Sequence, residues 1–246
     1  MKNILVTGAG GFIGSHLCEI LVQAGYKVQA FVHYNSRNYC GWLEDSAFRD
    51  EIEVQMGDIR DFDTVSSAVS KADAICQLAL SYAFSFEMPV TVIRPFNTYG
   101  PRQSLRAVIP TIISQMASNK DAIELGNISP KRDLTYVADT CSGFVKALET
   151  DKVAGKVLNL GTGETISIKM LAEKIMSLMG RSVEIITKDD RIRPKKSEVR
   201  CLQSDNCLAK KLLGWEPEVS LEQGLSKTIE FIQNNMSAYN SNGYII

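Results

Sequence analysis

Apolar residues in the first 80 positions recur in short runs that are separated by a helical pattern or by polar segments. Four runs have the length and composition of buried strands: NILVTG (3–8), KVQAFVH (27–33), EIEVQMGD (51–58) and ADAICQLAL (72–80). Between the first two runs, apolar residues recur at helical spacing, at Ile13, Leu17, Ile20 and Leu21. Gly25 follows where a helix C-terminus favours glycine. Strands that alternate with helices predict an α/β fold with a Rossmann-type, doubly wound parallel sheet.

Near the other end of the chain, the segment SLEQGLSKTIEFI (220–232) predicts one more amphipathic helix. Ser220 and Gln223 have the spacing of a capping box, and Leu225, Ile229 and Ile232 form an apolar stripe. We interpret this segment as scaffold.

The composition is that of an ordinary globular protein and excludes few classes of function. The chain has 246 residues, of which 45% are hydrophobic and 22% are charged, with a formal net charge of −1. This balance gives no reason to expect a nucleic-acid or membrane partner, and no apolar run reaches the length of about 18 residues that a membrane span needs. The N-terminus reads as a strand and a turn, and the six cysteines form no C-x-x-C pair. We therefore expect free thiols in a reducing cytoplasm and no metal site.

The turn after the first predicted strand carries the sharpest local signal. It reads TGAGGFIG, with glycines at positions 8, 11 and 14, and an amphipathic helix follows it. Glycines in this context let the backbone turn tightly and approach a pyrophosphate, while the helix N–H groups point at its charge. The strand–turn–helix context predicts dinucleotide binding.

Seven motifs together resemble the extended short-chain dehydrogenase/reductase family, in its NAD-dependent epimerase/dehydratase group. They are VTGAGGFIGSHL, GDIRD, RPFNTYGPRQ, RDLTYVADT, LNLGTGETISI, RPKKSEV and LGWEP. The chain looks most like the bacterial nucleotide-sugar 4,6-dehydratases of legionaminic-type pathways. The resemblance implies an NAD(P)-binding Rossmann domain over residues 1–100, interrupted near residue 80. Residues 101–246 would form mainly a smaller substrate lobe, with some elements returning to the Rossmann sheet.

The resemblance also implies a set of cofactor-binding residues. The pyrophosphate would lie on Gly8, Gly11, Phe12, Ile13 and Gly14; the adenine would meet Asp58 and Ile59; and the nicotinamide ribose would pass Leu78 and Ala79.

The end of the second strand leaves the choice between NAD and NADP open. An acidic residue there would bond the ribose 2′-hydroxyl, but this chain has HYNSR at positions 33–37. Ser36 and Arg37 could hold a 2′-phosphate, or they could belong to a solvated polar loop. Since similar relatives use NAD, we favour NAD.

The second half would bind the substrate, a nucleotide-diphosphate sugar carrying UDP or GDP. By resemblance, Asn97 would bond the sugar diphosphate, Val108 would pack against the base, and Arg132 and Arg193 would hold the diphosphate. Guanidinium forks suit phosphates, although either arginine alone could be a surface charge.

The catalytic segment of the family has no counterpart in this sequence. It would contain a Ser or Thr at the end of a fifth strand and a Tyr-x-x-x-Lys on the next helix. Here ADAICQLAL runs directly into SYAFSFEMPV, and none of the eight tyrosines has a lysine four positions later. We interpret this as the loss of a strand, a helix and most of a second helix, at least about 35 residues. Those helices form the homodimer's helix bundle in the family, so a dimer here would have a damaged interface.

Two functions remain open on the sequence. One is a dehydratase or epimerase homologue that is inactive if these residues are the whole protein. The other is a non-catalytic dinucleotide- or nucleotide-sugar-binding protein with a regulatory or scaffolding role. Of these two functions, only the dehydratase or epimerase homologue would allow a longer form of the chain to be catalytically active.

Overall fold

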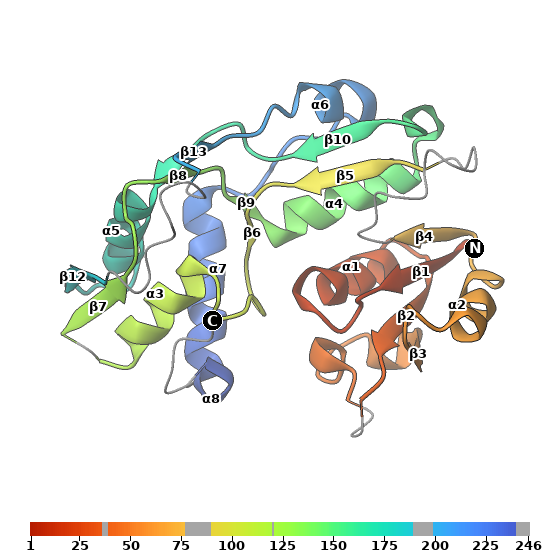
Figure 1. Ribbon diagram of the computed structural model, residues 1–246, viewed down its shortest axis with the longest axis horizontal. Coiled ribbons are helices and arrows are strands. Elements are labelled where there is room, and N and C mark those ends of the chain that lie inside the picture. The colour runs from red at the N-terminus through yellow and green to blue at the C-terminus, as the bar shows by residue number, and fades with distance from the viewer. Residues whose placement is uncertain (36–38, 77–89, 120, 189–198, 240–246) are drawn as a thin grey trace. The chain divides into compact units, whose positions relative to one another are not determined.

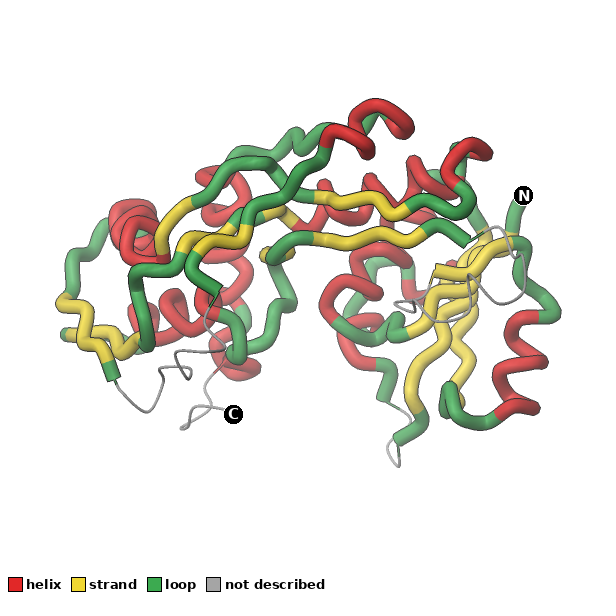
Figure 2. Tube along the Cα trace, turned by 45° about the horizontal axis from the view of Figure 1, so that its top comes forward, coloured by secondary structure: helices red, strands yellow, loops and turns green. Residues whose placement is uncertain are grey.

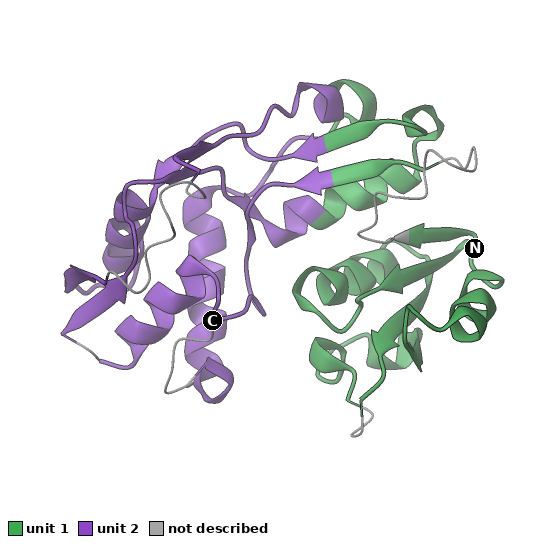
Figure 3. Ribbon diagram, viewed as in Figure 1, with its two compact units in different colours: residues 1–93, 141–158, 211–215 green, residues 94–140, 159–210, 216–246 purple. Residues whose placement is uncertain are grey.

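The computed structural model describes residues 1–35, 39–76, 90–119, 121–188 and 199–239 (Figure 1). These residues form two compact units, and the chain passes between them several times. Unit 1 comprises residues 1–93, 141–158 and 211–215, and unit 2 comprises residues 94–140, 159–210 and 216–246 (Figure 3).

Unit 1 contains a four-stranded parallel sheet whose strands lie side by side in Figure 2. The sheet order is β3-β2-β1-β4, with bounds β1 Asn3–Thr7, β2 Lys27–His33, β3 Ile52–Gly57 and β4 Ala74–Cys76. The connecting helices are α1 Phe12–Gln23 and α2 Phe62–Val69, and two short 3₁₀ helices are Gly41–Leu43 and Arg49–Glu51. The predicted α/β fold with a Rossmann-type parallel sheet is confirmed.

The central strands β1 and β2 are apolar because both faces of the sheet are buried there. Ile4, Leu5 and Val6 are buried, as are Ala30 and Phe31 on the neighbouring strand. Helix α1 buries Leu17 and Leu21, two of the four apolar positions predicted for its inner face. Gly25 has a φ of 84° directly after the C-cap Ala24, which is the left-handed conformation expected at that position.

Two strands and two helices run across the division between the units. Strands β5 (Val92–Pro95) and β10 (Val157–Leu160) form a separate two-stranded sheet, and the helices are α4 (Val137–Leu148) and α6 (Cys207–Leu213). A third 3₁₀ helix covers Asp151–Val153. Within the described residues, β4 pairs only with β1, and β5 pairs only with β10. One edge of each strand therefore has no partner strand in this part of the chain.

Unit 2 is built on three helices that pack against one another: α3 Val108–Ala117, α5 Ile168–Leu178 and α7 Leu221–Asn234. The predicted capping box of Ser220 and Gln223 starts α7, and Leu225, Ile229 and Ile232 are buried. Short strands surround these helices: β7 Ala122–Leu125 with β12 Glu184–Thr187; β6 Thr98–Tyr99 with β9 Thr135–Tyr136; and β8 Lys131–Arg132 with β11 Ile166–Ser167 and β13 Cys201–Leu202. Helix α8 (Met236–Tyr239) follows α7.

Candidate functional site

The turn between β1 and α1 has the close backbone packing that its glycines predict. Gly8 has a φ of 66°, which favours glycine, and a Cβ on Gly14 would lie 2.3 Å from the carbonyl oxygen of Gly8. Helix α1 starts after Gly11 with no side-chain cap on its first turn. Its first N–H groups have no acceptor within the helix, so this end can bind an anion. The geometry fits the pyrophosphate of a dinucleotide, with Phe12 and Ile13 as the first helical residues.

A further glycine, Gly10, was not among the predicted site residues. A Cβ on Gly10 would lie 2.6 Å from the carbonyl oxygen of Cys40, and Trp42 N donates a hydrogen bond of 3.1 Å to Gly10 O. Gly41 has a φ of 68° and would also clash with Gly10 if it carried a Cβ. The segment after β2 thus packs directly on the glycine turn. The second glycine in the run GAGG was the sequence signal for this contact.

Asp58 and Ile59 lie directly after β3, at the same edge of the parallel sheet as the glycine turn. Arg60 donates from Nε and Nη2 to the two carboxylate oxygens of Asp58, and its backbone N–H donates to Oδ1 at 2.9 Å. These hydrogen bonds hold the pKa of the Asp58 carboxyl far below its usual range. Ile59 is 63% exposed. An apolar side chain exposed at the carboxyl edge of a parallel sheet is compatible with the predicted adenine contact.

Five predicted site residues lie outside the described residues. They are Ser36, Arg37, Leu78, Ala79 and Arg193.

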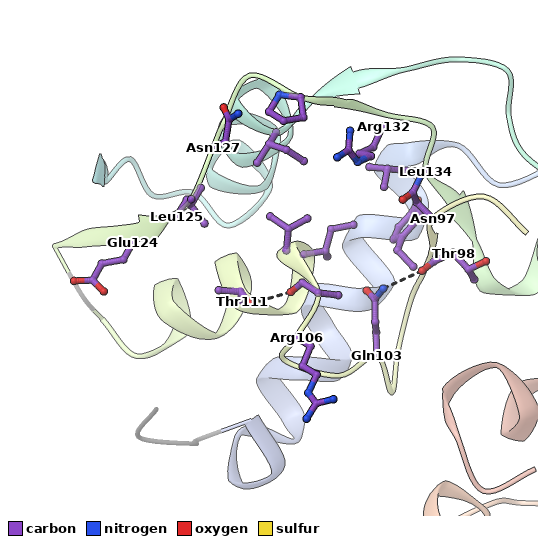
Figure 4. Close-up of a pocket in the computed structure, with 17 residues that line it drawn as sticks. Asn97, Thr98, Gln103, Arg106, Thr111, Glu124, Leu125, Asn127, Arg132 and Leu134 are labelled. Atoms are coloured by element: carbon purple, nitrogen blue, oxygen red, sulfur yellow. Dashed lines mark hydrogen bonds between the residues drawn. The ribbon is translucent and has the colours of Figure 1, made fainter. Parts of the chain in front are cut away.

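In unit 2, a cavity of about 340 Å³ brings together the three remaining predicted substrate residues, Asn97, Val108 and Arg132 (Figure 4). These residues come from the segment after β5, from the start of α3 and from β8. The lining also includes Leu125, Asn127, Pro130 and Ile168. Ligand cavities usually start at about 300 Å³, so the volume suits one nucleotide-sized ligand.

Hydrogen bonds fix the side chains of Asn97 and Arg132, the two polar residues among the three predicted substrate residues. Asn97 has a φ of 28°, and its Nδ2 donates to the carbonyl oxygen of Asp133 at 2.9 Å. A non-glycine residue at positive φ costs energy and persists where the surroundings hold it, often at functional sites. Arg132 Nη1 donates to Lys131 O at 2.9 Å and to Val199 O at 2.8 Å. The guanidinium is thereby held in one orientation at the cavity wall.

Tyr99 also lines the cavity, but it is only 1% exposed and its hydroxyl donates to Leu221 O at 3.3 Å. Burial, together with the nearby Tyr136 and Asp139, raises the pKa of Tyr99 far above its ordinary value. The hydroxyl therefore stays protonated at neutral pH, and Tyr99 serves to pack α7 against the cavity wall.

Within the described residues, no group of three or more His, Cys, Asp or Glu side chains could hold a metal ion. In the same part of the chain, no helix is both long enough and apolar enough to cross a membrane.

Comparison with known proteins agrees with the fold. The chain is 28% identical over 231 residues to the dTDP-D-glucose 4,6-dehydratase of Mus musculus. The matched residues cover 91% of this chain and 62% of the relative. It is 30% identical over 165 residues to the UDP-glucuronate 4-epimerase of Thermodesulfobacterium geofontis, over 67% of this chain and 49% of the relative. The chain therefore spans less than two thirds of the length of these relatives.

Among solved structures, the fold is similar to the UDP-glucuronic acid 4-epimerase from Bacillus cereus in complex with UDP-glucuronic acid and NAD. The TM-score is 0.82 at 23% identity, and the similarity covers 95% of this chain and 99% of that one. The fold and the glycine turn define a Rossmann-type α/β protein. A family model described as GDP-mannose 4,6 dehydratase matches residues 5–80 and 68–228, and the chain belongs to this family.

Proposed function

We propose that this chain binds a dinucleotide, NAD in preference to NADP, on the glycine turn of unit 1 and a UDP- or GDP-sugar in the cavity of unit 2. The observation that carries the proposal is the cavity itself, because it unites Asn97, Val108 and Arg132 from three separate segments. The Bacillus cereus relative holds both kinds of ligand, UDP-glucuronic acid and NAD. Two further parts of the proposal are homodimer assembly, which rests on the resemblance, and a cytoplasmic location, which rests on the cysteine pattern.

The same proposal limits what the chain does with these ligands. The 246 residues contain no Tyr-x-x-x-Lys, so we propose binding without dehydration or epimerisation. If these residues are the whole protein, the missing motif makes the chain an inactive dehydratase or epimerase homologue; the alternative is a non-catalytic nucleotide-sugar-binding protein with a regulatory or scaffolding role. A bound dinucleotide would supply hydride transfer, but the residues described here only position the two ligands.

We expect calorimetry to detect weak binding of NAD, and of NADP more weakly still. Gly8→Ala should abolish this binding, because Gly8 faces open space on the turn where the pyrophosphate would lie. Gly25→Ala is a matched control, since Gly25 also has a positive φ (84°) and no atom within 4 Å of the added Cβ. Both variants should lose about 1 kcal/mol of folding stability, but only the first should lose ligand binding. No heat with either dinucleotide from folded wild-type protein would refute this part of the proposal.

We expect Arg132→Ala to weaken binding of UDP about 10- to 100-fold, because hydrogen bonds to charged groups contribute about 1.5–3 kcal/mol. Arg132→Lys should restore only part of the affinity, since lysine cannot form a planar fork with a phosphate. Lys131→Ala is the control, because adjacent strand residues point to opposite sides and Lys131 is exposed. Thermal melts of each variant test folding. Equal binding of a free sugar and its UDP form by wild-type protein would contradict the substrate class.

A further inference from the structure

A loop in the cavity wall, residues 126–130, is held by hydrogen bonds from α5 and by hydrogen bonds within the loop. Ile168 N donates to Pro130 O at 3.1 Å, and Lys169 N donates to Ile128 O at 3.0 Å, so the start of α5 fixes the loop from outside. Within the loop, Asn127 Oδ1 accepts from Ser129 N at 3.0 Å and from Ser129 Oγ at 2.8 Å. The Asn127 side chain is therefore fixed on a rigid support.

These two hydrogen bonds determine which end of the Asn127 amide is used. A backbone N–H can bond only to the amide oxygen, so the oxygen faces Ser129 and the NH₂ group is the other end. Asn127 lines the cavity, and Figure 4 shows it on the opposite side from Asn97 and Arg132. The NH₂ group is therefore the end of the Asn127 amide that is left to donate to a ligand at this wall of the cavity.

The two sides of the cavity differ in chemistry. Asn97 and Arg132 provide donors and a positive charge on one side, whereas buried Leu125, Pro130 and Ile168 provide apolar surface near Asn127. A nucleoside diphosphate has the same division: charged phosphates at one end, and at the other a flat base with apolar faces and polar edges. This orientation places the base beside Asn127.

We propose that Asn127 determines base specificity by donating a hydrogen bond to a ring carbonyl of the nucleotide base. The inference rests on the proposed function, because it assumes that the cavity takes a nucleotide diphosphate. Uracil, thymine and guanine carry a carbonyl oxygen at the base edge where cytosine and adenine carry an amino group. An NH₂ donor pairs with the first three bases and leaves two donors facing each other with the last two.

The test is the ratio of UDP to CDP affinity, measured by calorimetry for wild-type protein and for Asn127→Asp. The substitution keeps an oxygen to accept from Ser129 and replaces only the NH₂ group with an acceptor. Its added negative charge repels both nucleotides equally, because UDP and CDP have the same phosphates, so the ratio reports the base alone. We expect wild type to prefer UDP by about tenfold and Asn127→Asp to abolish or reverse the preference. Ser129→Ala loosens the loop without changing the amide and should leave the ratio unchanged.

Each outcome separates this inference from the proposed function. If wild-type protein binds neither nucleotide, the proposed function fails. If it binds UDP and CDP equally, or if Asn127→Asp weakens both without changing their ratio, the nucleotide binds but Asn127 does not read the base.

Discussion

Purified 246-residue protein should form no 4-keto product when it is incubated with NAD and a panel of UDP- and GDP-sugars. A positioned general acid or base contributes about 10²- to 10⁴-fold to a reaction rate, and this chain lacks the family's tyrosine base and its activating lysine. Such groups act as a unit, so ligand positioning alone should not yield useful turnover.

Tyr99 is a tyrosine that lines the cavity and could be considered as a replacement for the missing base, but its surroundings oppose that role. Its hydroxyl is buried, donates to Leu221 O and has a strongly raised pKa, so it does not accept a proton in the neutral pH range. Product formation that persists in Tyr99→Phe would show that the active site lies elsewhere in the chain. An active relative assayed in parallel with the same substrates shows that the measurement can detect turnover.

The strands of unit 1 could be predicted because each is a short apolar run whose pattern is set by burial. β2 has the predicted bounds, Lys27–His33, and β1 and β3 differ from theirs only at the ends. The two-residue strands of unit 2, such as β6 and β8, could not be predicted in this way. They are too short to carry a hydrophobic period, and partners far along the chain define them.

The candidate site, too, could be predicted from the sequence only in part. Asn97, Val108 and Arg132 came from motif resemblance, and the cavity brings them together. Asn127 was missed because its significance depends on one hydrogen-bonded turn and on its position in the cavity wall. No periodicity or composition signals either feature, so only the folded arrangement could reveal it.

Asp133, next to Arg132, is a second residue whose importance only the structure reveals. Its side chain is 0% exposed. Oδ1 accepts from the N–H and the hydroxyl of Thr162, and Oδ2 accepts from the N–H groups of Gly163 and Ser204. The carboxylate therefore joins the cavity wall to two segments that lie far away in the sequence. All four of its partners are donors, so no neutral side chain of similar size can satisfy them all.

We expect Asp133→Ala to lower the free energy of unfolding by roughly 3–5 kcal/mol, because it leaves several buried donors without an acceptor. Asp133→Asn should lose less, since it keeps one oxygen and places an NH₂ group against the other pair of donors. Urea unfolding of both variants, followed by fluorescence, measures the order of stability.

Asp121→Ala removes an exposed carboxylate from the same unit and should change stability by no more than about 0.5 kcal/mol. UDP affinity should fall with stability in the Asp133 variants, because the carboxylate holds the wall that carries Asn97 and Arg132. If Asp133→Ala were as stable as Asp121→Ala, the four hydrogen bonds would contribute nothing to the fold.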